Sequence, residues 1–204
     1  MTGKPLLLAM LMVAGCASST VDRDEPRRLL GRESDVRVDA QMFGNRINPG
    51  TIVTINYEIQ NFRSEPIAFA EGPATADLDT SSRTITVRIG AEVPGIPPLP
   101  RLQVIGPGEK KSFTTGARMN FLIPDRGEQL SNYPQSLRIR VNILRSVEPF
   151  SMLVGPQEGP QDPNLAEEIF PAWVENIASV TTNSIPINWG RPIQTTTPPR
   201  RGRN

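Results

Sequence analysis

The segment 137–143 most constrains the fold of this chain, because its side chains alternate without a break. Every second position is a large aliphatic residue and every position between them is polar: Leu137, Arg138, Ile139, Arg140, Val141, Asn142 and Ile143. Successive side chains of a β-strand point to opposite faces of a sheet, so this period of two predicts a strand. The segment is expected to face a core with one side and water with the other.

Six other segments repeat this pattern and are separated by turn sequences. The predicted strands lie in 36–42, 53–59, 67–69, 84–89, 102–104 and 110–115, and the first two are expected to pair. With 21 prolines, 16 glycines and only 5% aromatic residues, the composition favours turns and short strands over long helices. The sequence therefore predicts an all-β protein, a single antiparallel β-sandwich of about 7–9 strands.

The remaining segments divide the chain around this sandwich. Residues 34–193 form the predicted domain, with the strands in 34–150 and a C-terminal extension in 151–193. In the extension, Asp162 and Pro163 are expected to begin a short helix that Pro171 ends, and 173–182 and 185–189 are expected to form a hairpin. Residues 194–204 are predicted to be a disordered basic tail with Arg200, Arg201 and Arg203.

The N-terminus has the layout of a secretory signal. Residues 1–4 include a lysine, 5–14 are apolar, and small residues follow. The apolar stretch is too short to span a membrane as a helix, which needs about 20 residues. Residues 16–33 mix small polar residues with both signs of charge and show no hydrophobic period, so they are predicted to be a flexible tether.

The sequence Val13-Ala14-Gly15-Cys16 ends the apolar stretch and contains the only cysteine of the chain. It resembles the lipobox of bacterial lipoproteins. The resemblance implies cleavage after residue 15, a diacylglyceryl group on the Cys16 thiol, and often acylation of the new amino terminus. Because alanine and not aspartate follows Cys16, the resemblance also favours the outer membrane. A plain signal peptide cut elsewhere is the alternative.

Two further stretches, NPGTIVTINYEIQN and VIGPGEKKSF, are similar to those of bacterial Ig-like envelope domains. In that family a turn glycine precedes a core strand, and the sequence PGE joins two strands. The resemblance covers part of the chain and implies that the sandwich is Ig-like.

Catalysis finds no support in the sequence. The chain has no histidine, which excludes Ser-His-Asp and Cys-His sites and every zinc site that needs imidazole. Asp77 and Asp79 are spaced like calcium ligands, but the other ligands of such a loop are missing, so they are expected to cap a turn. We expect no enzymatic activity, no cofactor and no metal site. The near balance of 22 basic and 21 acidic residues indicates no nucleic-acid partner.

Three features are candidates for partner binding, and each has an alternative. The first is a proline-rich stretch, which would be stiff and would lose little conformational entropy when it binds a partner. The alternative is that its aliphatic residues cover the open end of the sandwich. The stretch comprises Val93, Pro94, Ile96, Pro97, Pro98, Leu99 and Pro100. Trp173 and Trp189 are possible interface anchors, or they pack the C-terminal extension onto the sandwich. Arg88, Arg138 and Arg140 could meet an anionic glycan or an acidic partner, or form an ordinary solvated face.

Taken together, these features predict a non-enzymatic envelope lipoprotein. Its N-terminal lipid would bind the membrane, and its sandwich would act as a binding or structural adaptor for another envelope component. One alternative is an accessory lipoprotein subunit of a secretion or envelope assembly machine. The other is a proteinase inhibitor that acts through the proline-rich stretch.

Overall fold

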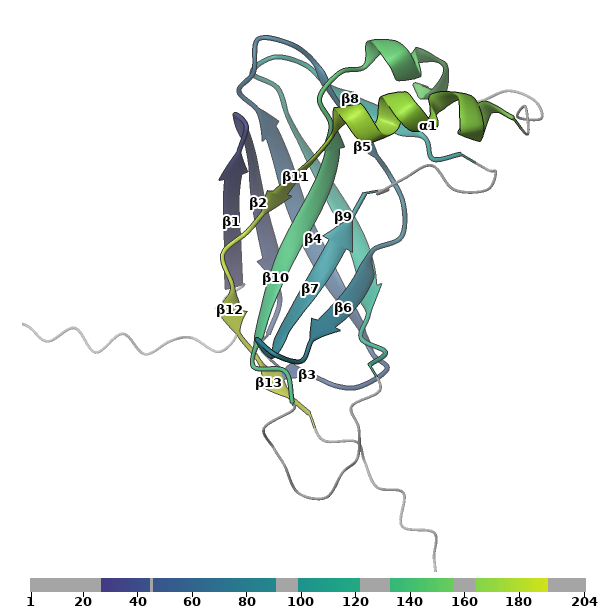
Figure 1. The fold of residues 1–204 in the computed structure, drawn as a ribbon. Coiled ribbons are helices and arrows are strands. Elements are labelled where there is room, and N and C mark those ends of the chain that lie inside the picture. The colour runs from purple at the N-terminus through teal and green to yellow at the C-terminus, as the bar shows by residue number, and fades with distance from the viewer. Residues whose placement is uncertain (1–26, 45, 91–98, 122–132, 156–163, 191–204) are drawn as a thin grey trace, which may run out of the picture.

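A computed structural model describes residues 27–44, 46–90, 99–121, 133–155 and 164–190 of the chain. The fold is an all-β sandwich with a short helix near its C-terminus, as the alternation predicted (Figure 1). The described residues form thirteen strands, more than the expected 7–9, because several are very short. The strands are β1 (Arg27–Glu33), β2 (Val36–Met42), β3 (Arg46–Ile47), β4 (Ile52–Asn61), β5 (Ile67–Ala70), β6 (Thr75–Asp79), β7 (Thr84–Ile89), β8 (Leu102–Ile105), β9 (Lys110–Arg118), β10 (Ser136–Leu144), β11 (Ile177–Thr181), β12 (Ile185–Pro186) and β13 (Asn188–Trp189).

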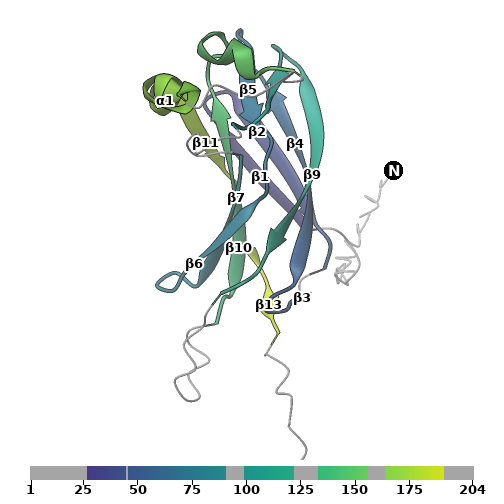
Figure 2. The same cartoon turned by 90° about the vertical axis from the view of Figure 1, so that its right-hand side faces the viewer.

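Two sheets pack face to face (Figure 2). The first has the order β1-β2-β4-β9 and is antiparallel throughout, and β2 pairs with β4 as predicted, with Val38 opposite Ile59. The second has the order β6-β7-β10-β5-β8, and β11 and β12 also pair with β10. The expectation of a wholly antiparallel sandwich is wrong in the second sheet, where β7 and β10 run parallel. β3 and β13 form a separate two-stranded sheet.

The inter-sheet core contains the apolar side of each alternating strand. On β10, Leu137, Ile139 and Val141 are fully buried, as their spacing predicted. Three aromatic rings contact one another in this core, with centroid distances of 5.0 to 6.0 Å among Tyr57, Phe69 and the partly buried Phe113. Burial of the apolar faces supplies the main driving force for the sandwich, because the described residues contain no disulfide to constrain it.

The strand β1 corrects the predicted tether, which was expected to extend to residue 33. Leu29 is fully buried, and β1 pairs with β2 along its whole length. Its free edge is held against the second sheet, since the Leu30 amide donates to the Asn183 side chain (2.6 Å) and the Asn183 amide donates to the Leu30 carbonyl (2.9 Å). The next residue of β1 that faces inward after Leu29 is Gly31, which has no side chain. The segment therefore lacks the alternation of apolar and polar residues that predicted the other strands.

The C-terminal extension also differs from its prediction. The helix α1 (Leu165–Asn176) continues through Pro171 instead of ending there. An interior proline costs a helix about 3 kcal/mol, but Ile169 and Trp173 are buried on either side of it, and their packing outweighs that cost. The expected hairpin after α1 does not form, because β11 and β12 pair with β10 and not with each other.

A second apolar cluster lies at one end of the sandwich. There α1 and the 3-10 helix η2 (Glu148–Leu153) cover the outer side of β5 and β8, and we call these two helices the cap. Trp173 meets Phe150 edge to face at a centroid distance of 5.3 Å. All four residues of β5 are buried, because Ile67 and Phe69 face the inter-sheet core while Ala68 and Ala70 face the cap.

The described part of the chain begins and ends at the opposite end of the molecule from the cap (Figure 1). The Arg27 guanidinium donates to the Pro186 carbonyl at 3.3 Å, and Pro186 pairs with Ser136 at the start of β10. At the other end of β10, Leu144 pairs with Ile177, the residue that follows α1. A strand of this length spans about 26 Å, at roughly 3.3 Å per residue. The cap is therefore about one sandwich length from Arg27.

Candidate functional site

The proline-rich stretch lies mostly outside the described residues, as does Cys16. Val93, Pro94, Ile96, Pro97 and Pro98 are not described, and Pro100 is half-buried. Leu99 is only 5% exposed and belongs to the apolar cluster under the cap. The prediction that Leu99 offers itself to a partner is therefore wrong, and the alternative, that it covers the end of the sandwich, is confirmed for this residue.

Both tryptophans pack against the body of the protein. Trp173 is fully buried beneath the cap. Trp189 is half-buried, packs against the inter-sheet core, and contacts Phe121 at a centroid distance of 5.7 Å. The prediction of exposed interface anchors is wrong for Trp173, because the amphipathic helix turns this residue inward. For both residues the packing alternative is confirmed.

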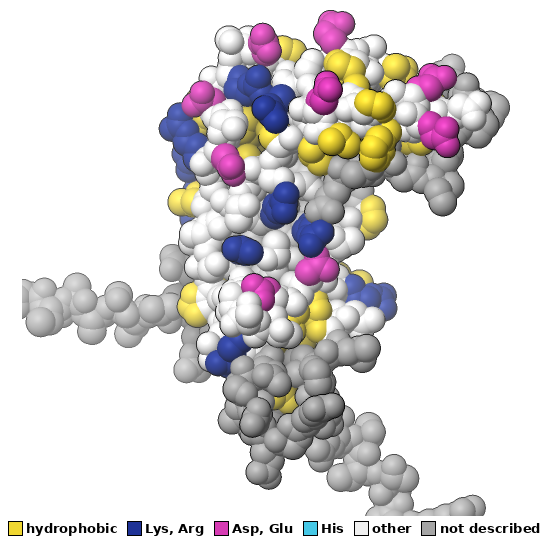
Figure 3. All heavy atoms as spheres, in the orientation of Figure 1, with side chains coloured by type: hydrophobic (Ala, Val, Ile, Leu, Met, Phe, Trp, Pro, Cys, Tyr) yellow, Lys and Arg dark blue, Asp and Glu magenta, His cyan; other side chains and the backbone are white. Residues whose placement is uncertain are grey.

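The exposed apolar residues of the C-terminal extension are different ones, which the sequence analysis missed. Met152 of η2 and Phe170 and Val174 of α1 are 51%, 47% and 50% exposed, and we call these three side chains the cap surface. Figure 3 shows apolar side chains gathered over the cap. Phe170 and Val174 are four residues apart and so neighbours on one face of α1, next to the face that buries Ile169 and Trp173. That helical spacing was the available signal.

The cap surface has an acidic rim. Glu167, Glu168 and Glu175 are exposed on α1, and Glu148 begins η2. The sequences of the two helices, LAEEIFPAWVEN and EPFSML, contain no lysine or arginine. The two cap helices thus combine exposed apolar side chains with charge of a single sign, whereas both signs occur on the rest of the face shown in Figure 3.

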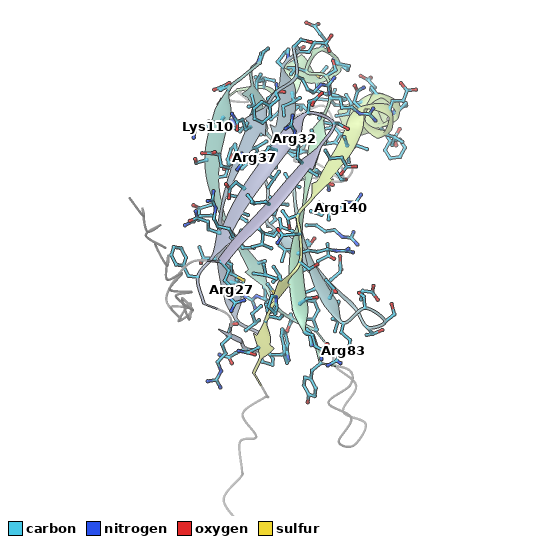
Figure 4. The ribbon with its side chains drawn as sticks, turned by 90° about the vertical axis from the view of Figure 1, so that its left-hand side faces the viewer. Arg27, Arg32, Arg37, Arg83, Lys110 and Arg140 are labelled. Atoms are coloured by element: carbon cyan, nitrogen blue, oxygen red, sulfur yellow. The ribbon has the colours of Figure 1, made fainter. Side chains whose placement is uncertain are left out.

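The three outward arginines of the second sheet lie together on its outer face, as the sequence placed them. Arg138 and Arg140 follow each other on one side of β10, and Arg88 of β7 is the register partner of Arg140. They line a shallow hollow of about 320 Å³ together with Asp77, Leu78, Asp79, Thr86 and Thr181. Figure 4 shows Arg140 pointing away from the sandwich, on the side opposite Arg37 and Lys110.

Asp77 and Asp79 have separate structural roles beside this hollow. Asp77 pairs with Arg88 at 2.8 Å. Asp79 accepts hydrogen bonds from the amide and hydroxyl groups of Ser81 and Ser82, and these bonds, the hydroxyl ones foremost, lower the pKa of its carboxyl group. The predicted turn-capping role is confirmed for Asp79, while Asp77 serves as an ion-pair partner.

Within the ranges given above, no three histidine, cysteine, aspartate or glutamate side chains lie close enough to hold a metal ion together. Among the helices in those ranges, none has the length and apolar character to span a membrane.

No protein-family model matches the chain, and no curated protein matches it. The functional argument therefore depends on the geometry of this molecule.

Proposed function

We propose that this protein is a non-enzymatic, lipid-anchored envelope lipoprotein, and that its Ig-like sandwich is an adaptor that binds a partner protein through the cap surface. The observation that supports this function is the position of the cap surface. The described chain begins at Arg27, and the cap surface lies at the opposite end of the sandwich.

The lipobox resemblance places the anchor at Cys16. Residues 17–26 separate Cys16 from Arg27, and a chain of that length reaches at most about 35 Å when fully extended. The sandwich adds about 26 Å along β10 before the cap is reached. A domain held in this way has Arg27 toward the membrane and can present its cap to a partner farther from the membrane.

The chemistry of the cap surface specifies the kind of partner. Phe170 and Val174 offer exposed apolar side chains one turn apart on α1, Met152 adds another on η2, and the glutamates of α1 give the cap negative charge. Helices of this kind bind by laying an apolar face in a groove, and charged rims set orientation and selectivity. The partner we propose is an envelope protein with an apolar groove bordered by lysine or arginine.

Site-specific photo-crosslinking in intact cells tests this function. A photoreactive residue at Val174 should capture one partner protein through a peptide that contains apolar and basic residues. The matched position is Ile52, which is 60% exposed at the start of β4, and it should not capture that partner. Changing Glu167→Lys and Glu168→Lys together should weaken the Val174 crosslink.

Other outcomes would contradict the proposal. Capture of the same protein from Ile52, crosslinks only to lipid or to a second copy, or no effect of charge reversal would each reject the cap as the docking site. Copurification of this protein in a stoichiometric complex with several other subunits would instead favour the alternative, an accessory subunit of an envelope assembly machine.

The anchor has its own test. Cys16→Ala should abolish labelling by radioactive or clickable fatty acids and release the protein from membranes. A variant that stays membrane-bound without acylation would reject the lipid anchor, whatever the result at the cap.

A further inference from the structure

The arginines on the outer face of the second sheet are held in place from the sheet side. The Arg138 Nε donates to the Thr86 hydroxyl at 3.0 Å, and the Arg140 Nε donates to the Ser179 hydroxyl at 3.0 Å. A guanidinium has five N–H donors in a fixed plane, so a bond at Nε fixes that plane and leaves the Nη donors for other partners. Both side chains are thereby oriented before any ligand arrives.

A buried polar residue supports this arrangement. The Ser179 hydroxyl that accepts from Arg140 donates in turn to the Asn142 Oδ1 at 2.8 Å. Asn142 is 2% exposed, and among the described residues its Nδ2 has no hydrogen-bond partner. A buried amide group without a partner lowers the stability of the fold. The hydrogen-bonded series Asn142, Ser179 and Arg140 therefore costs stability, and orienting Arg140 for a ligand would explain why the protein has it.

The charges on this face are incompletely paired. Within the described part of the chain, neither Arg138 nor Arg140 forms an ion pair, and their Nη groups contact no acceptor there. Asp77 pairs with Arg88, and Asp79 is committed to the hydroxyl and amide groups of the following turn. On the first sheet, by contrast, Arg28 and Arg37 both contact Asp39, and Lys110 contacts Glu58.

We infer that the hollow lined by Arg88, Arg138 and Arg140, with Asp77 and Asp79 beside them, binds a phosphate group carried on a larger molecule, either a lipid headgroup or a soluble sugar phosphate. A terminal phosphate offers three acceptor oxygens, whereas a carboxylate offers two, and oriented guanidinium groups bind such oxygens in pairs. The hydroxyl of Thr181 at the edge of the hollow can bond to the carrier. This site is separate from the cap surface and does not depend on the adaptor function.

Calorimetric titration of the full chain in nonionic detergent with glucose 1-phosphate tests the site. We expect saturable binding that weakens with added salt, and glucuronate, which carries a carboxylate on a similar ring, should bind more weakly. In the same detergent, short-chain phosphatidic acid should bind more tightly than the sugar phosphate if a lipid is the source, and no better if it is a sugar. Equal binding of glucuronate, or no binding to either phosphate, would overturn the inference.

Substitutions assign the binding to these residues. The double variant Arg138→Gln, Arg140→Gln should bind the phosphate about tenfold or more weakly, because each substitution removes charge-assisted hydrogen bonds to it. Arg118→Gln removes the same charge from an exposed position on β9 and should change affinity less than about twofold. Arg140→Lys keeps the positive charge but loses the paired N–H donors of the guanidinium, so an intermediate loss of affinity is expected. Unchanged binding in the double variant, at an unchanged melting temperature, would reject the site.

Discussion

The inter-sheet core and the cluster under the cap are both apolar and well buried, but they are built differently. The core is formed by alternating strands, and its residues recur at every second position. The cap cluster is formed by Leu99, the two helices and the outward positions of β5 and β8, which share no common period. The core therefore follows from local pattern, whereas the cap depends on segments that only the folded chain brings together.

This difference indicates that the cap is the less cooperative part of the molecule. Among the described strands, only β5, β8 and the end of β10 contribute fully buried side chains to the cap cluster. Regions with few shared contacts can unfold locally without global unfolding. The following predictions test this contrast, from the largest expected effect to the smallest.

Trp173→Ala should have the largest effect, because it empties the centre of the cap cluster. Truncating a buried tryptophan costs about 3–5 kcal/mol. We expect hydrogen exchange measured by mass spectrometry to show loss of protection in α1 and η2, while β2 and β4 keep theirs. Phe170→Ala, an exposed change on the same helix, should leave protection nearly unchanged. Equal loss of protection in β2 and β4 would mean that cap and core unfold as one unit.

Gly31→Ala should act on the core and spare the cap. A Cβ at this position would lie 2.6 Å from the Thr181 carbonyl oxygen, so β1 and β11 would have to separate. We expect a loss of roughly 1–3 kcal/mol in urea unfolding, as for other overpacked sites. Gly72→Ala meets no atom within 4 Å and is the matched control. Comparable losses in both variants would show that the close approach of β1 to β11 is not the cause.

Asp79→Asn should have the smallest effect and should depend on pH. Hydrogen bonds from Ser81 and Ser82 hold the folded-state pKa of Asp79 below its usual value near 3.8. The ionised carboxylate therefore stabilises the fold above that pH, and this contribution is lost as the pH falls below it. Melting temperatures should differ slightly at pH 7, and the difference should shrink between about pH 4 and pH 2. A difference independent of pH would contradict this assignment.

The candidate sites divide in the same way. Outward positions on a strand are readable from alternation, so the face with Arg138 and Arg140 was predicted, and Arg88 with it. Their convergence on one hollow was not, since it requires the parallel pairing of β7 with β10. The cap surface was not predicted, because only the packing of α1 on the sandwich decides that Trp173 is buried and Phe170 is exposed.

The sequence alone determined the all-β class, the inward faces of the principal strands and the turn at Asp79, because these depend on neighbours one to three residues apart. The N-terminal anchor remains a prediction of the sequence, since residues 1–26 lie outside the described part of the chain. Tertiary structure decided that residues 27–33 form a strand, that α1 continues past Pro171, and which apolar side chains stay exposed. These outcomes depend on packing between segments far apart in the chain, and that packing outweighs local preference.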